Sequence, residues 1–313
     1  MSSVQQINLN DGHSMPMVGF GTYEATGADI RVAIRAGYRL FDGADFYGNE
    51  AEVGAALRAA IAAGEVIRDQ LFVVSKVWPN WLAAGRPTLS AERTLQNLGL
   101  DYVDLLLIHW PTPFKQVDDD YHPGASDGQV LFDESIELAD VWREFELIKQ
   151  KGLTRSIGVS NFNARQIQDL IDKSSTVPAV LQVESHPYFA NTQLLRFCQQ
   201  KGIAFIGYSP LATTGPNKSL VPPIQLPLIR ELAKKYGIGD AIVILRWQVQ
   251  RGVTVIPKSS TPERIAANIR LFDFKLTDDE MTAIDGLDRN YRCHPWTHWG
   301  IGKHKNYPFS DPF

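Results

Sequence analysis

Four side chains that can donate a proton, or can support a neighbouring group that does, stand at or just after short apolar runs of the sequence. Asp42, Lys76 and His109 each end such a run, and Tyr47 follows Asp42 by five residues. A buried lysine is costly unless it is paired, and Asp42 can supply the partner. A tyrosine beside that cation is a candidate general acid, because the cation would lower the phenol pKa from about 10. A neutral His109 could then orient a carbonyl oxygen beside Tyr47.

Each of these residues also has a structural explanation when it is taken alone. Lys76 and Asp42 could form an ion pair inside a barrel mouth, and His109 could be a hydrogen-bonded core histidine. Taken together, four different groups directed at one place favour chemistry over structure. We therefore interpret Asp42, Tyr47, Lys76 and His109 as a catalytic site.

Apolar strands that alternate with amphipathic helices are expected to position this site. The expected strands cover residues 18–22, 38–41, 71–77, 103–110, 156–160, 180–183, 204–208 and 253–256. The expected helices cover residues 30–36, 49–63, 89–98, 136–151, 164–171, 193–201, 228–236 and 262–269. A turn at Asp11-Gly12 predicts an N-terminal β-hairpin. Eight βα units without a linker predict an α/β fold, a single (β/α)8 TIM barrel over residues 1–313.

Three segments interrupt this repeat, namely residues 111–134, 212–225 and 287–313. In a barrel the first two follow the fourth and seventh strands, so they are long loops on the catalytic face and can act as lids or pocket walls. We expect an apolar substrate pocket with aromatic walls. Its predicted residues are Tyr23, Trp78, His109, Trp110, Phe114 and Trp299. Alternatively, some of these rings only close the top of the barrel.

Composition argues against several classes of partner. The chain has 31 Lys+Arg and 35 Asp+Glu with no long run of one sign, so we expect neither nucleic acid nor a membrane surface as a partner. The two cysteines, Cys198 and Cys293, are too few for a disulfide scaffold and are interpreted as free thiols. A polar N-terminus and the lack of a long apolar stretch predict a cytoplasmic protein.

The tail contains several side chains that could bind a metal ion. Cys293, His294, His298 and His304 could offer ligands, and His294 and His298 have the spacing of one helix face. Pro295 disfavours a helix there and no carboxylate completes the set, so no metal is predicted. No exposed heptad or long apolar surface stripe is visible in the sequence either. We expect a monomer or a weak homodimer.

Seven segments spread over nearly the whole chain form a recognisable pattern. They are Gly19-Phe-Gly-Thr, Phe41-Asp-Gly-Ala-Asp-Phe-Tyr-Gly-Asn-Glu50, Leu107-Ile-His-Trp-Pro111, Ser156-Ile-Gly-Val-Ser-Asn-Phe162, Gln182-Val-Glu-Ser-His-Pro-Tyr188, Tyr208-Ser-Pro-Leu211 and Ile256-Pro-Lys-Ser259. In residue identity, spacing and order these segments resemble the aldo-keto reductases. Two segments have the residues found in fungal xylose reductases, namely Phe41-Asp-Gly-Ala and Tyr47-Gly-Asn-Glu50. The tail segment His304-Lys-Asn-Tyr-Pro-Phe309 is instead similar to the C-terminal end of animal aldose reductases.

The resemblance implies a nicotinamide cofactor, NADPH in preference to NADH, since no side chain can deliver hydride. Ser160, Asn161 and Gln182 would bind the carboxamide, and Tyr208 would stack on the nicotinamide ring. The other cofactor residues implied are Gly21, Thr22, Ser209, Leu211, Lys258, Ser259, Thr261, Arg264 and Asn268. Lys258 and Arg264 would lie near a 2′-phosphate, unless they are only a solvated surface pair.

The expected function is therefore reduction of an aldehyde or an aldose such as D-xylose to the alcohol, with hydride from the nicotinamide and a proton from Tyr47. The expected partner is a small carbonyl substrate. Two alternatives stay open. The same fold could reduce a ketone or a sugar acid, or the chain could be a regulatory protein that binds NADPH without catalysis.

Overall fold

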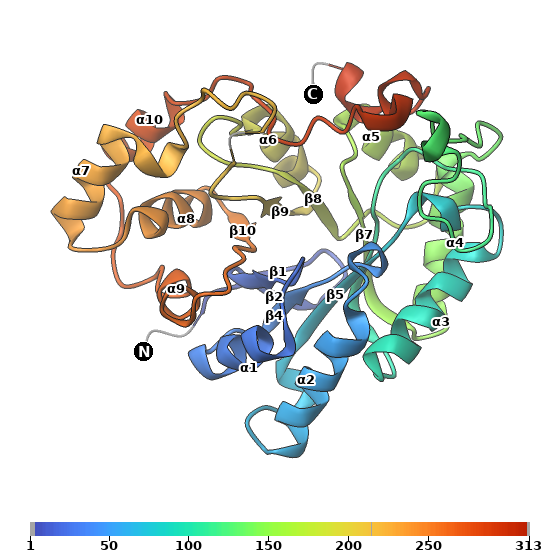
Figure 1. The fold of residues 1–313 in the computed structure, drawn as a ribbon, viewed down its shortest axis with the longest axis horizontal. Helices are drawn as coiled ribbons and strands as arrows, with labels where there is room; N and C mark the ends of the chain where they lie inside the picture. Colours follow the sequence, from blue (N-terminus) through green and yellow to red (C-terminus); the bar gives the residue numbers. More distant parts are fainter. Residues whose placement is uncertain (1–3, 214, 312–313) are drawn as a thin grey trace.

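The computed structural model describes residues 4–213 and 215–311. Eight parallel strands, hydrogen-bonded in chain order, form the central sheet (Figure 1). They are β3 (Gly19–Gly21), β4 (Leu40–Asp42), β5 (Phe72–Val77), β6 (Val103–Ile108), β7 (Thr154–Ser160), β8 (Val180–Glu184), β9 (Ala204–Tyr208) and β10 (Val253–Val255). A parallel bridge between Val18 and Val255 joins the first strand to the last. The sheet closes, which confirms the predicted (β/α)8 TIM barrel.

Residues along each strand point alternately into the barrel and out to the helices. Leu105 and Leu107 of β6 belong to the inner apolar cluster, whereas Leu106 and Ile108 belong to the outer one. Neighbouring strands approach closely at Gly158, where an added Cβ would lie 2.5 Å from the Val180 carbonyl oxygen. The eight predicted strands are confirmed, and their ends differ from prediction by at most two residues.

The predicted N-terminal hairpin is confirmed and closes one end of the barrel. Its strands, β1 (Gln6–Asn8) and β2 (Ser14–Pro16), are antiparallel. Leu9 and Met15 from this hairpin are buried in the same apolar cluster as the inward-facing strand residues. The hairpin therefore fills the barrel interior at the amino-terminal ends of the strands.

Helices surround the sheet (Figure 1). The α-helices are α1 (Gly27–Ala36), α2 (Glu50–Ala62), α3 (Arg86–Leu98), α4 (Leu138–Gln150), α5 (Ala164–Lys173), α6 (Thr192–Gln200), α7 (Pro227–Tyr236), α8 (Asp240–Gln250), α9 (Pro262–Asn268) and α10 (Asp278–Asp285). Short 3₁₀ helices are η1 (Asp45–Tyr47), η2 (Arg68–Gln70), η3 (Pro79–Trp81), η4 (Ala125–Asp127), η5 (Pro223–Gln225), η6 (His298–Lys303) and η7 (Pro308–Ser310). The eight predicted helices are confirmed.

Two helices, α8 and α10, lie outside the prediction. Nearly all of α8 is buried, so its apolar residues surround the helix and show no one-sided repeat. Helix α10 is mostly polar, but it begins with a capping box in which Thr277 and Glu280 bond to each other's backbone amides. That spacing is a sequence signal that would have predicted its start.

The segments 111–134 and 212–225 lie at the carboxyl ends of the strands, as predicted. The segment 111–134 follows β6 and is held by the Trp78 indole, which donates to the Tyr121 carbonyl at 2.7 Å. The segment 212–225, described except for residue 214, follows β9. The tail, in red in Figure 1, passes near α5, where Asn163 donates to Asp311 at 2.8 Å. Within the described residues, no helix has the length and apolar character that crossing a bilayer requires.

Candidate active site

Strand alternation directs a set of polar side chains into the open end of the barrel. Asp42, Lys76 and His109 each stand two positions beyond an inward-facing apolar residue, Leu40, Val74 and Leu107 respectively. The same spacing relates Gln182 to Val180, Tyr208 to Ile206 and Lys258 to Ile256. Side chains two residues apart on a strand share a face, so the apolar interior gives way to a polar layer.

Lys76 is the centre of this layer. Its ammonium nitrogen lies 2.6 Å from Asp42 Oδ1, 2.8 Å from the Gly43 carbonyl oxygen and 3.4 Å from Tyr47 Oη. Lys76 and Asp42 are 1% and 2% exposed, so the ion pair is shielded from water. Asp42 is held from its other side by Gln182, whose amide donates to Oδ2 at 2.6 Å. The ammonium is therefore fixed beside the phenol.

The structure corrects the expectation that Tyr47 has an unusually low pKa. Burial, the largest effect, raises the pKa of Tyr47, and the nearby Lys76 cation opposes that rise without reversing it. The phenol is therefore protonated at neutral pH. A protonated phenol beside a fixed cation can donate its proton, and the cation then stabilises the phenolate that is left.

His109 completes the predicted four. Its ring lies edge-to-face with Tyr47 at a centroid distance of 6.0 Å and with Trp78 at 4.9 Å. Burial and, secondarily, the Lys76 cation hold the pKa of His109 well below 6.5. The imidazole is therefore neutral at physiological pH and can act as a hydrogen-bond donor, as expected.

A cavity of about 420 Å³ is lined by Asp42, Tyr47 and His109, and Lys76 lies buried behind them. Of the predicted cofactor residues, it is lined by Gly21, Thr22, Ser160, Asn161, Gln182, Tyr208, Ser209 and Lys258. The remaining ones, Leu211, Ser259, Thr261, Arg264 and Asn268, do not line it. Lys258 and Arg264 are exposed, and Asn268 is buried within α9. The predicted cofactor set thus divides into a cavity group, a group that continues past β10 into α9, and Leu211, which follows β9.

One wall of the cavity has hydrogen-bonding groups suited to a carboxamide. Both ends of the Asn161 amide are engaged within the protein, because Nδ2 donates to the His109 carbonyl at 3.0 Å and Oδ1 accepts from Tyr208 at 2.9 Å. Ser160 Oγ accepts from Asn161 at 3.2 Å, which leaves its own proton free. Gln182 uses its amide nitrogen on Asp42, which leaves Oε1 as an acceptor. A donor and an acceptor on one wall fit a nicotinamide carboxamide.

Two of the predicted substrate residues lie elsewhere. Tyr23, Trp78, His109 and Trp110 line the cavity as expected. Phe114, only 1% exposed, does not: it packs against Trp78, His122 and Phe132 in the core. Trp299 lines an adjoining cavity of about 660 Å³ and contacts His122 at a ring distance of 4.3 Å. Both positions depend on how the long loops fold, which the strand pattern does not encode.

Six cavity residues were not predicted, namely Glu24, Phe46, Pro210, Ile256, His294 and Trp296. Phe46 stacks on Trp78 with the ring centroids 3.9 Å apart, and Trp296 packs against Trp78 and Trp110 at 5.3 and 4.8 Å. His294 contacts Ser209 Oγ at 3.2 Å. Phe46 directly precedes Tyr47 in the family-like segment 41–50, so its place near the cavity could have been predicted from the sequence. Trp296 and His294 lie in the tail, where no periodicity indicates which side chains turn inward.

The tail histidines do not form the metal site that their spacing brought into consideration. No helix runs through residues 294–298 in the described tail, as Pro295 predicted, and His298 is exposed at the start of η6. His304 is buried against Phe132 at a ring distance of 4.9 Å. The tail histidines are therefore dispersed.

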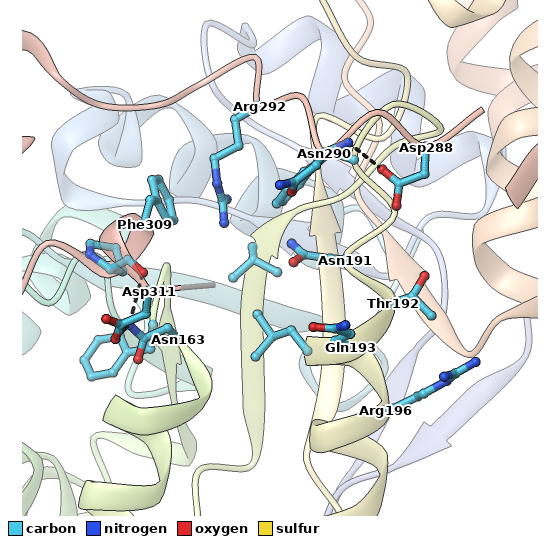
Figure 2. Close-up of a pocket in the computed structure, with 15 residues that line it drawn as sticks. Asn163, Asn191, Thr192, Gln193, Arg196, Asp288, Asn290, Arg292, Phe309 and Asp311 are labelled. Carbon is cyan, nitrogen blue, oxygen red and sulfur yellow. Dashed lines mark hydrogen bonds between the residues drawn. The ribbon is translucent and has the colours of Figure 1, made fainter. Parts of the chain in front are cut away.

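Another cavity, of about 540 Å³, lies between the start of α6 and the tail (Figure 2). It shares no lining residue with the cavity over Tyr47. Arg292 extends into it, and its guanidinium lies 4.1 Å from the Phe189 ring centroid and 3.5 Å from that of Phe309. None of the four predicted catalytic residues reaches this cavity, so it is separate from the candidate active site.

A closed barrel with a cavity at the carboxyl ends of its strands has the layout of (β/α)8-barrel enzymes. Comparison with known proteins identifies the family. The model of the Aldo/keto reductase family matches residues 18–289. Aldo-keto reductase family 1 member C1 of Homo sapiens is 42% identical over 334 residues, covering 100% of this chain and 99% of that protein. Aldo-keto reductase family 1 member A1 of Xenopus tropicalis is 40% identical over 329 residues, covering 100% and 99%.

A solved structure agrees with these sequence matches. The structure of the aldose reductase from Schistosoma japonicum superposes with a TM-score of 0.92 at 36% identity, covering 99% of this chain and 100% of that one. The chain therefore belongs to the aldo/keto reductase family, as the resemblance implied. It is an oxidoreductase of a family that reduces carbonyl groups with NAD(P)H. The fungal xylose reductase likeness stays a prediction.

Proposed function

We propose that this protein reduces aldehydes, aldoses among them, to alcohols with NADPH, and that Tyr47 donates the proton. The single observation that carries the proposal is the position of Tyr47 Oη, 3.4 Å from the buried Lys76 ammonium at the base of the cavity. Bound NADPH supplies the hydride. The chain's own residues bind the carbonyl, orient it and protonate its oxygen.

Each catalytic residue has one task in this proposal. Tyr47 gives its proton to the carbonyl oxygen as the carbon receives hydride. Lys76 stabilises the phenolate, and Asp42 keeps Lys76 charged and in place. Neutral His109 donates a hydrogen bond to the carbonyl oxygen, which aligns that oxygen with the Tyr47 hydroxyl.

Residues of the cavity wall and of α9 would hold the cofactor. Ser160 and Gln182 offer a donor and an acceptor to the carboxamide, and Asn161 fixes the position of Ser160 and Tyr208. Lys258 and Arg264 are exposed cations for which no ion pair is found within the described residues. Two such cations favour the 2′-phosphate that distinguishes NADPH from NADH.

Aromatic side chains form much of the cavity wall above Tyr47. Such a wall favours aldehyde substrates that carry an apolar group beside the carbonyl. The rings are those of Tyr23, Phe46, Trp78, Trp110 and Trp296. Apolar walls around one hydrogen-bonding centre tolerate many aldehydes. A panel of DL-glyceraldehyde, D-xylose, glucuronate, an aromatic aldehyde and an aromatic ketone, each with NADPH and with NADH, measures this preference. Higher kcat/KM for the ketone would contradict the assigned class, and the highest value for glucuronate, which is itself an aldehyde at C1, would favour the sugar-acid alternative.

Tyr47→Phe tests the proposed acid directly. Removing the phenol hydroxyl should lower kcat by at least about 100-fold, while NADPH still binds with nearly unchanged affinity in a fluorescence titration. Tyr102→Phe is the matched control, because it removes a phenol that lies outside the cavity and bonds Asp69 at 3.3 Å. Undiminished turnover by Tyr47→Phe would refute the role of Tyr47, and an inactive wild type that binds NADPH would favour a regulatory protein.

A further inference from the structure

A cluster of three metal-ligating side chains lies next to the candidate active site. Glu184 Oε1, His186 Nε2 and Cys293 Sγ all lie within 4.8 Å of one another, and all three residues are buried. Glu184 is the last residue of β8, two positions beyond Gln182, so it stands on the strand from which Gln182 holds Asp42. Cys293 comes from the tail. The cluster therefore joins the barrel to the tail.

We propose that Glu184, His186 and Cys293 form a binding site for one zinc ion. Carboxylate, imidazole and thiolate are the ligand types that zinc prefers, and the thiolate selects against magnesium and calcium. On binding, the Cys293 thiol releases its proton to solvent and the thiolate forms the bond to zinc. The proton by which His186 Nε2 contacts Glu184 passes to Nδ1, which frees the Nε2 lone pair for zinc. One thiolate, one carboxylate and one neutral imidazole then neutralise the two positive charges, which a buried site requires.

The distances between the three ligand atoms are close to those of a tetrahedral zinc site. His186 Nε2 lies 2.7 Å from Glu184 Oε1 and 3.4 Å from Cys293 Sγ. Zinc bonds of about 2.1 Å to nitrogen and oxygen and about 2.3 Å to sulfur place these pairs roughly 3.4 and 3.6 Å apart. Zinc binding therefore requires the Glu184–His186 pair to separate by about 0.7 Å. The fourth ligand in this proposal is a water molecule.

The backbone around each ligand is already fixed. His186 and Phe189 exchange backbone hydrogen bonds of 3.1 and 2.8 Å, which hold the turn after β8. The Cys293 and His294 amides donate to the Glu184 carboxylate at 2.5 and 3.0 Å, so the tail is attached to β8. A preformed set of ligands lowers the entropy that is lost on metal binding.

An entry route for the ion exists on the tail side. Cys293 lines the cavity of about 660 Å³ that also includes Thr213, Lys218 and Trp299. The thiol donates to the Thr213 carbonyl at 3.0 Å, so zinc would replace this contact between the tail and the 212–225 segment. Zinc binding is independent of the proposed reduction, because none of the three ligands belongs to the catalytic four.

Cobalt and zinc titrations of the purified full-length chain, without a histidine tag and freed of metal with a chelator, test the proposal. We expect about one Zn²⁺ per chain by calorimetry, and with Co²⁺ a thiolate-to-cobalt charge-transfer band in the near ultraviolet. Cys293→Ser keeps the size and hydrogen bonding of the side chain, and it should abolish the band and weaken Zn²⁺ binding at least about tenfold. Cys198→Ala removes the other thiol and should keep the band.

Zn²⁺ should also raise the midpoint of thermal unfolding of the wild type and of Cys198→Ala, but not that of Cys293→Ser. Lack of a cobalt–thiolate band in the wild type overturns the proposal, and this result does not depend on whether any variant folds. Equal Zn²⁺ affinity of the wild type and a folded Cys293→Ser overturns it as well. Activity is not the readout, so failure of the zinc site is distinguishable from failure of the proposed reduction.

Discussion

The ammonium nitrogen of Lys76 lies 3.4 Å from the phenolic oxygen of Tyr47. Burial is the dominant influence on Tyr47 and raises its pKa, and the Lys76 cation opposes that rise. The two effects have different consequences for an acid catalyst. Burial keeps the proton on the phenol until it is needed, and the cation stabilises the phenolate once the proton has left.

Lys76→Met should lower kcat by about 100-fold or more, since the variant cannot stabilise the phenolate. Reduction needs the protonated phenol, so rate is lost when pH rises through the pKa of Tyr47. Without the cation that pKa rises further, and any basic limb of the kcat/KM profile should move to higher pH. Steady-state rates between pH 6 and pH 10 measure both effects.

Lys76→Met also leaves Asp42 buried without its ion-pair partner, which destabilises the fold. The double variant Lys76→Met/Asp42→Asn removes that unpaired carboxylate and is the proper control. It should regain stability in a urea titration but not activity. Recovery of turnover by the double variant would show that Lys76 acts through stability alone.

The low pKa of His109 predicts a specific acid sensitivity. In the unfolded chain this histidine takes up a proton near pH 6.5, whereas in the folded chain burial and Lys76 keep it neutral. The unfolded state therefore binds more protons below pH 6.5, and stability falls as pH falls, by at most about 1.4 kcal/mol per pH unit for this group. His109→Gln should lose less stability than the wild type between pH 6.5 and pH 5.5 in urea titrations. Equal losses would mean that His109 protonates normally.

Lys258→Ala and Arg264→Ala should each raise the KM for NADPH about tenfold and change the KM for NADH little. The reason is that each would remove one charge-assisted contact to the 2′-phosphate, worth about 1.4 kcal/mol. Arg270→Ala, another exposed cation just beyond α9, is the control and should leave both constants unchanged. Equal effects of Lys258→Ala on the two cofactors would indicate a contact other than the 2′-phosphate.

Gly158→Ala should destabilise the barrel by about 1–3 kcal/mol. The new methyl group would lie 2.5 Å from the Val180 carbonyl oxygen and 2.8 Å from Leu107 Cδ2, so β7 and β8 would have to separate. Gly286→Ala is the matched control. Its backbone has φ of -65° and ψ of -8°, and its nearest contact is 3.4 Å. This control should be neutral or stabilising by up to about 1 kcal/mol in chemical denaturation.

Local pattern in the sequence predicted the eight barrel strands, most of the helices and the four residues of the candidate catalytic site. Strand periodicity is a property of a few consecutive residues, and in a closed barrel it also sets where each strand ends. Asp42, Lys76 and His109 were therefore predictable, because each stands two residues beyond an inward-facing apolar residue. Helix α8 was not, since burial on all sides removes the one-sided pattern by which helices are recognised.

Only the tertiary structure decided the features that depend on contacts between distant segments. Phe114 packs into the core and Trp296 lines the cavity because of the way the long loop and the tail cross the barrel mouth. The pKa of Tyr47 is raised by burial among residues that are remote in sequence. The juxtaposition of Glu184 and His186 with Cys293 likewise joins positions separated by more than a hundred residues. Strand and helix patterns encode neighbours along the chain, whereas burial and ligand geometry arise from packing across it.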